Sequence, residues 1–202
     1  MTDLEKATTT DIRHSSFGIN SSSVIRHSSL QSAFTLIELI VVFGIILVLS
    51  GLILSTAGYA RKKAARTRAE TEIAAMSAAI ENYKADKGVY PTDATATDSL
   101  DSTAAINFTN YQTASQYMYG ELAGDPDFDG VPTLKAYMQF KPNMLGTDAN
   151  NKVYPRDPFG NSYGYSTRMA TTGSGGYNPT FDLWSTTGIT SGSDSTQWIK
   201  NW

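Results

Sequence analysis

Residues 34–59 read FTLIELIVVFGIILVLSGLILSTAGY, and this stretch decides the fold. It is 26 residues long and carries a single charge, on Glu38. About 20 apolar residues in a helix cross the hydrocarbon core of a bilayer, so the stretch is long enough to span a membrane with tilt to spare. Its glycines at Gly44, Gly51 and Gly58 are better tolerated in transmembrane helices than in soluble ones. The alternative, a buried core helix, would need a much larger protein around it.

The following residues continue the helix beyond the membrane. Residues 61–88 read RKKAARTRAETEIAAMSAAIENYKADKG, which is rich in Ala, Glu, Lys and Arg and lacks proline. Apolar residues recur at spacings of three and four, which predicts one buried stripe on this helix. The stripe comprises Ile73, Met76, Ile80 and Tyr83. Gly88, followed by Pro91, is a stop signal. We therefore expect one helix from Phe34 to about Lys87, roughly 80 Å long at 1.5 Å per residue.

Both flanks of this long helix differ from it in composition. Residues 1–33 are rich in Ser and Thr and show no apolar period, which predicts a disordered leader. Residues 89–202 are rich in Gly, Asp, Asn, Ser, Thr, Tyr and Pro, and are expected to form a globular head. The expected organisation is thus a leader over 1–33, a transmembrane part over 34–59, an amphipathic part over 60–88 and the head.

Short elements are expected inside the head. Residues 114–122 predict a short helix that ends near Gly124. The motif DPFGNSYGYS at 157–166 predicts a turn into a strand, and TFDLWST at 180–186 predicts another strand. Loops are expected over residues 171–176 and 191–195. The predicted fold class is α+β, in which a long N-terminal helix packs on a small antiparallel sheet.

The overall composition excludes several classes of site. The chain has 202 residues and no cysteine, so disulfides, zinc thiolate sites and cysteine nucleophiles are excluded. Both histidines, His14 and His27, precede the apolar stretch, so no Ser-His-Asp triad forms in the rest of the chain. A formal net charge of −3 is too mild to argue for nucleic acid as a partner. We expect no enzyme activity.

The start of the apolar stretch, SAFTLIELIVV at 32–42, resembles the prepilin signal of type IV pilins and pseudopilins. In that family a prepilin peptidase cleaves before a Phe that opens a long apolar helix, and a Glu stands four residues after that Phe. The resemblance implies cleavage between Ala33 and Phe34, with Glu38 as the assembly residue. Ala33 stands where the family usually has Gly, and the leader is longer than is common in the family.

Three further stretches resemble the major pseudopilins of type II secretion. They are AIENYKADKGVYPT at 79–92, DPFGNSYGYS at 157–166, and FDLWSTTG at 181–188 with the terminal WIKNW. Residues 93–154 show no clear counterpart. The resemblance implies a pilin-like fold and a structural subunit of a periplasmic filament, anchored in the inner membrane by a single span.

The same resemblance implies the partners. They are further copies of this chain in a homopolymer, minor pseudopilins, the prepilin peptidase and an inner-membrane assembly platform. Two alternatives remain open at this point: a type IV pilin of a surface filament for adhesion, motility or DNA uptake, and a membrane-tethered binding module that never polymerises.

Glu38 needs a partner if it lies in lipid, because a buried carboxylate costs about 2.5–3.5 kcal/mol on insertion scales. Cleavage would give Phe34 a free α-amine. The resemblance implies that Glu38 faces this amine on a neighbouring subunit, and two charges that are each costly in lipid become tolerable together. The alternative is that Glu38 snorkels or stays protonated near the interface.

Five positive charges lie between Arg61 and Arg68, just beyond the apolar stretch. Three interpretations are open: the run binds lipid phosphates, contacts nucleic acid, or is a solvated face that pairs Arg66 with Glu70 and Arg68 with Glu72. The positive-inside rule would place this run in the cytoplasm. The prepilin-like start favours the opposite orientation, with the head in the periplasm.

Two loops are candidate calcium sites. DPDFDG at 125–130 carries Asp125, Asp127 and Asp129 like the front half of an EF-hand loop, although its twelfth position is Ala136 instead of Glu. A solvated acidic turn is the alternative.

FDLWSTTG at 181–188 and the terminal WIKNW at 198–202 bound what we call the closing loop. This loop resembles the calcium loop of the family, which implies Leu183, Ser185 and Asp194 as ligands there. The first loop is favoured slightly, because its three carboxylates repel one another unless a cation lies between them.

Overall fold

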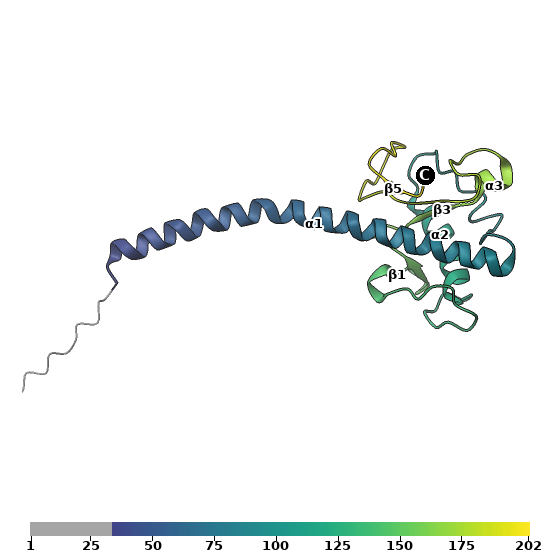
Figure 1. Cartoon of the computed structure of the whole chain (residues 1–202), viewed down its shortest axis with the longest axis horizontal. Coiled ribbons are helices and arrows are strands. Elements are labelled where there is room, and N and C mark those ends of the chain that lie inside the picture. The colour runs from purple at the N-terminus through teal and green to yellow at the C-terminus, as the bar shows by residue number, and fades with distance from the viewer. Residues whose placement is uncertain (1–33) are drawn as a thin grey trace, which may run out of the picture. The chain divides into compact units, whose positions relative to one another are not determined.

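The computed structural model describes residues 34–202, with the backbone alone for Ser55 and Thr56. The predicted leader, including Ala33, lies outside the described residues. Among the described residues, contacts divide the chain into two units at the boundary between Val48 and Leu49. Helix α1 (Leu36–Lys87) begins in the first unit and continues into the second (Figure 1).

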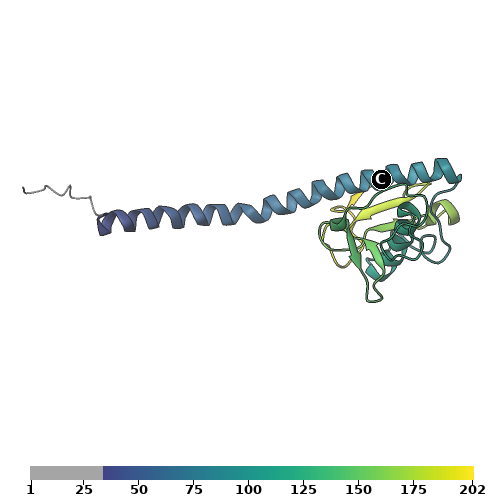
Figure 2. The same ribbon diagram turned by 90° about the horizontal axis from the view of Figure 1, so that it is seen from below.

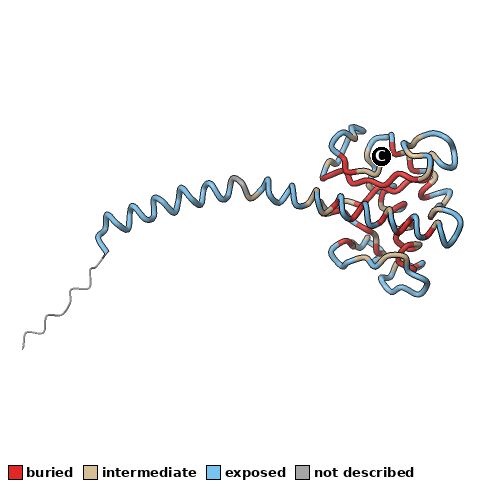
Figure 3. Tube along the Cα trace, in the orientation of Figure 1, coloured by how far each residue is buried: buried red, intermediate tan, exposed pale blue. Residues whose placement is uncertain are grey.

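The first part of α1 is apolar on all sides. Every residue from Phe34 to Leu54 is exposed and is coloured pale blue in Figure 3. By length and composition, α1 is the one helix among the described residues that could cross a membrane. Exposed apolar side chains around a whole helix need an apolar solvent, so this part of α1 is consistent with the predicted membrane span.

The second part of α1 carries the predicted stripe. Ile73, Met76, Ile80 and Tyr83 are all buried, which confirms the spacing argument. They pack in one core with Met118 and Leu122 of α2 (Phe108–Ala123), and with side chains from the sheet. Figure 2 shows the head along the C-terminal part of α1.

The strands are short and antiparallel. β1 (Leu145–Thr147) pairs with β2 (Val153–Pro155). A second sheet has the order β3-β4-β5, formed by β3 (Gly164–Ser166), β4 (Asp182–Ser185) and β5 (Ile199–Lys200). The α+β, pilin-like architecture predicted from the sequence is confirmed.

The second sheet is buried on both faces. Leu183 of β4 lies in the core against α1, whereas its neighbour Trp184 lies in a second core with Tyr111 and Trp198. Successive side chains of a strand point to opposite faces, so β4 serves both cores. Gly164 lies opposite Trp184 in the register, and a Cβ on Gly164 would come within 2.0 Å of the indole ring.

Two helices of the head, α2 and the short helix α3, differ from the sequence prediction. α2 begins at Phe108, six residues before the predicted start, because Asn107 caps it by accepting hydrogen bonds from the Thr109 and Asn110 amides. Its end is as predicted, at Gly124 in the left-handed region with φ 71°. The 3-10 helix η1 (Pro142–Met144) precedes β1. The predicted loop 171–176 begins inside a short helix, α3 (Arg168–Thr172).

Buried polar contacts fasten α1 to the head. Glu72 accepts a hydrogen bond of 2.6 Å from the Tyr163 hydroxyl and forms the predicted ion pair with Arg68, also at 2.6 Å. Arg66 does not pair with Glu70 as predicted. Its guanidinium donates instead to the Gln197 carbonyl at 2.9 Å. One cation of the basic run at residues 61–68, Arg66, is therefore bound directly to the head.

The stripe on α1 should dominate the stability of the head. Ile80→Ala is expected to lower the free energy of unfolding by about 2–5 kcal/mol, because it leaves a cavity in the core. Asn82→Ala, at an exposed position two residues away, is the control and should change it by less than about 0.5 kcal/mol. Urea unfolding in detergent micelles, followed by the fluorescence of the head's tryptophans, measures both. Equal effects of the two variants would contradict the packing described here.

Candidate functional site

The N-terminal end of α1 carries the predicted assembly residue, Glu38. Its Oε2 accepts hydrogen bonds from the amide and the hydroxyl of Thr35, each at 3.0 Å. The Thr35 hydroxyl in turn accepts a bond from the Glu38 amide at 3.2 Å. This reciprocal arrangement is a capping box, and it satisfies two backbone amides that a helix N-terminus otherwise leaves without a partner.

The capping box leaves part of Glu38 available. In the described residues Oε1 makes no hydrogen bond, so the carboxylate can cap its own helix and still accept from a second group. Phe34 lies at the start of the helix and is 79% exposed. The Thr-x-x-Glu spacing at 35–38 is a capping-box signature that the sequence analysis did not use.

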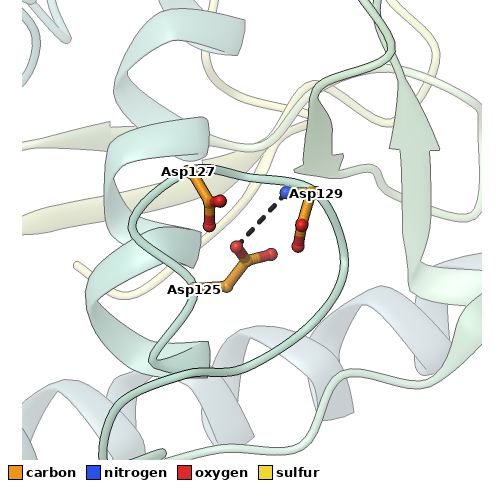
Figure 4. Close-up of side chains that lie close together, drawn as sticks. All are labelled: Asp125, Asp127 and Asp129. Atoms are coloured by element: carbon orange, nitrogen blue, oxygen red, sulfur yellow. Dashed lines mark hydrogen bonds between the residues drawn. The ribbon is translucent and has the colours of Figure 1, made fainter.

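The acidic loop that follows α2 is folded around Asp125 (Figure 4). This side chain is completely buried, and its carboxylate accepts bonds from the Tyr119 hydroxyl at 3.0 Å, the Asp129 amide at 3.2 Å and the Gly130 amide at 2.8 Å. Burial and the bond to Asp125 raise the pKa of Tyr119, so its phenol stays protonated and donates. Asp125 therefore has a structural role of its own.

The spacing of the three predicted carboxylates suits a cation. Asp125, Asp127 and Asp129 each offer an oxygen within 4.8 Å of the others. Calcium binds oxygen at about 2.3–2.6 Å, so two of its ligands lie at most about 5 Å apart. Asp127 and Asp129 are exposed, and the Lys152 ammonium donates to the Asp127 carbonyl. The carboxylates would supply part of a shell of six to eight oxygens, and water would complete it.

The structure places the three residues predicted in the closing loop in different surroundings. The amide and carbonyl of Leu183 both bond to Asn201. Ser185 is buried, and its hydroxyl donates to Asp157 at 2.5 Å. Asp194 is exposed and accepts a bond from the Thr196 amide at 2.9 Å. The carboxylate that meets Ser185 is therefore Asp157, which the sequence analysis did not select.

Asp157 is the acceptor at the centre of the DPFGN turn. It is 2% exposed and also accepts bonds from the Phe159 and Asn161 amides, at 3.0 and 2.9 Å. Burial raises the pKa of this carboxyl, and the charge of Glu72 adds to the effect. These bonds tie the turn to β4 and supply the buried carboxyl with hydrogen-bond partners.

The described fold is that of a pilin-like protein, with an exposed apolar helix continued by a stripe that packs on an antiparallel head. Residues 57–129 match the family model of the type II secretion system protein G. No curated protein and no solved structure matches the chain. The family match supports the pseudopilin resemblance, and it covers residues 93–129, part of a segment for which the sequence showed no counterpart.

The matched residues contain the acidic loop but neither Glu38 nor the closing loop. The family match therefore covers the amphipathic part of α1, the segment that follows it, α2 and the acidic loop. The resemblances at 32–42, 157–166 and 181–188 stand beside it as separate observations.

The structural role of Asp125 can be tested separately from metal binding by measuring stability in the presence of chelator. In chelator, Asp125→Ala should lower the free energy of unfolding by about 1–3 kcal/mol, mainly because the buried Tyr119 hydroxyl loses its acceptor. Adding Tyr119→Phe should recover part of this loss. Asp127→Ala is the control and should be within about 0.5 kcal/mol of the native chain. A large loss for Asp127→Ala in urea unfolding with chelator would contradict this assignment.

Proposed function

We propose that this protein is a structural subunit of a type II secretion pseudopilus and that it has no catalytic role. The observation that carries the proposal is the family match over residues 57–129, which includes the helix stripe and α2. The exposed apolar part of α1 supports it, because such a helix suits both a membrane anchor and the packed centre of a filament. The match to a type II secretion family favours a pseudopilus over a surface pilus.

Deletion of the gene tests this function. Proteins that the cell normally releases through its type II system should accumulate inside the envelope, and the cloned gene should restore their release. Normal secretion together with a loss of surface filaments would indicate a surface pilin instead. Normal secretion and normal filaments would support a tethered binding module.

We propose further that the chain is processed between Ala33 and Phe34 and lies in the inner membrane with its head in the periplasm. N-terminal sequencing of the membrane-bound protein should give Phe34 as the first residue. Ala33→Leu should leave the precursor uncut in the membrane. A mature chain that begins at Met1, or a reporter after Trp202 that is active only in the cytoplasm, would contradict this proposal.

Within a filament, we propose that Glu38 pairs with the α-amine of Phe34 on a neighbouring subunit. Two variants separate this role from capping. Glu38→Gln keeps an oxygen that accepts from Thr35 but loses the charge, whereas Glu38→Leu loses both. Both should insert into the membrane and fail to assemble, as measured by the yield of sheared filaments. Normal assembly of Glu38→Gln would show that capping alone is required.

Calcium at Asp125, Asp127 and Asp129 is the cofactor that we propose. Bound to the folded state alone, calcium at a hundredfold excess over its Kd stabilises by about 2.7 kcal/mol. The melting temperature of the full chain in micelles should therefore rise with calcium and fall with chelator.

Two variants that each remove one exposed negative charge locate the ion. Asp127→Asn should abolish the calcium-dependent shift, and Asp194→Asn should preserve it. If the native chain has the same melting temperature with calcium and with chelator, neither loop holds calcium. If only Asp194→Asn removes the shift, the ion lies in the closing loop.

A further inference from the structure

The first three residues of the basic run differ from the last two. Arg66 and Arg68 bond to the head, through the carbonyls of Gln197 and Asn143. The side chains of Arg61, Lys62 and Lys63 are exposed, and in the described part of the chain they make no hydrogen bond or ion pair. We refer to these three residues as the basic collar. Their charges are not used by the fold.

The collar covers more than half of the helix circumference instead of lining one face of it. Successive residues of an α-helix are about 100° apart, so three consecutive cations spread over about 200° of its circumference. A protein or nucleic-acid groove that binds a helix contacts one face. A layer of lipid headgroups contacts a helix from all sides, and this is the arrangement that the collar fits.

The position of the collar along α1 matches the headgroup layer. Residues 34–54 supply the roughly 20 apolar residues that a bilayer needs. Tyr59 follows, 74% exposed, and tyrosine is enriched at membrane–water interfaces. Arg61 lies about 10 Å beyond Leu54 along the helix, at 1.5 Å per residue.

Side-chain direction and reach bring the cations closer to the lipid. The Cα–Cβ bonds of a helix tilt toward its N-terminus, which for the collar is the membrane side. Long Lys and Arg side chains place their stems along apolar surface and their charged ends among the headgroups. The headgroup layer of one leaflet is about 5–8 Å thick, so the charged ends fall within it.

We propose that the basic collar binds the phosphates of anionic phospholipids in the leaflet that faces the head. This rests on the membrane anchor in the proposed function, and it gives the basic run a role on the exported side, where the positive-inside rule disfavours it. The first completely buried residue of α1, Ala69, lies about 9 Å beyond Lys63 at 1.5 Å per residue. Lipid binding at the collar would therefore set the height of the head above the membrane.

Spin-labelled lipids test the proposal with the full chain in phosphatidylcholine vesicles. A trace of labelled phosphatidylglycerol or labelled phosphatidylcholine reports the fraction of each lipid that is held at the protein. Both leaflets have the same composition, so the orientation of the chain does not affect the result. The native chain should prefer phosphatidylglycerol severalfold in low salt, and the preference should weaken in 0.5 M salt as screening increases.

Matched variants assign the preference to the collar. Replacing Arg61, Lys62 and Lys63 with Gln should reduce the preference to about one. The control replaces three exposed cations elsewhere with Gln, at Lys87, Lys141 and Arg156, and should keep the preference with the same loss of charge. Exchanging Lys62 and Lys63 for Arg preserves the charge, so this variant should also keep the preference for phosphatidylglycerol.

Other outcomes overturn the proposal. An inserted native chain without a lipid preference, or an equal loss in the control, removes the collar as a lipid site. Loss of duplex DNA binding in the collar variant, with its lipid preference unchanged, would assign the cations to nucleic acid. A chain that alkaline carbonate extracts from the vesicles contradicts the membrane anchor itself, and the collar with it.

Discussion

The head is assembled on one surface, the buried stripe of α1. Helix α2 contributes Met118 and Leu122 to this core, β3 contributes Tyr165, and β4 contributes Leu183. Tyr163, directly before β3, also lies in it. The strands of the head are two to four residues long, so their ladders supply few hydrogen bonds. Without cysteine, no disulfide can replace that deficit. Burial of apolar side chains against α1 is therefore the dominant source of stability.

Buried polar contacts then fix how the head lies on that surface. An apolar stripe alone would let the head slide along α1 by one helical turn. The hydrogen bond between Tyr163 and Glu72 forms at only one position of the head along the helix. The neighbouring Asp157 holds the DPFGN turn and β4 together through Ser185. Breaking either bond leaves a buried polar group without its partner, which is more costly than the bond is stabilising.

Local patterns in the sequence predicted those parts of the fold that depend on residues close together in the chain. The stripe on α1 was expected from the spacing of its apolar residues, the end of α2 from Gly124, and strands β3 and β4 from their flanking turn residues. The start of α2 was predicted too late, because Thr109, Asn110 and Thr113 have weak helix propensity and the Asn107 cap decides the boundary.

The sites were less predictable, since they depend on contacts between distant segments. Asp157 and Ser185 are 28 positions apart, and no local signal pairs them. The DPDFDG pattern identified three carboxylates that do lie together, but only the structure shows that Asp125 is already engaged by Tyr119 and two amides. The Thr35–Glu38 capping box was legible in the sequence, yet the charge of Glu38 drew attention to a partner outside the chain.

We propose that the apolar part of α1 serves as both membrane anchor and polymer contact. The native chain has no cysteine, so introduced cysteines report on their own contacts alone. One cysteine is fixed at Val42 and a second is moved from Leu49 to Leu54, too far along the helix for a disulfide within one chain. Oxidation in the membrane should give a ladder of species larger than dimers for at least one pair. Monomers alone, for every pair, would contradict polymerisation through this helix.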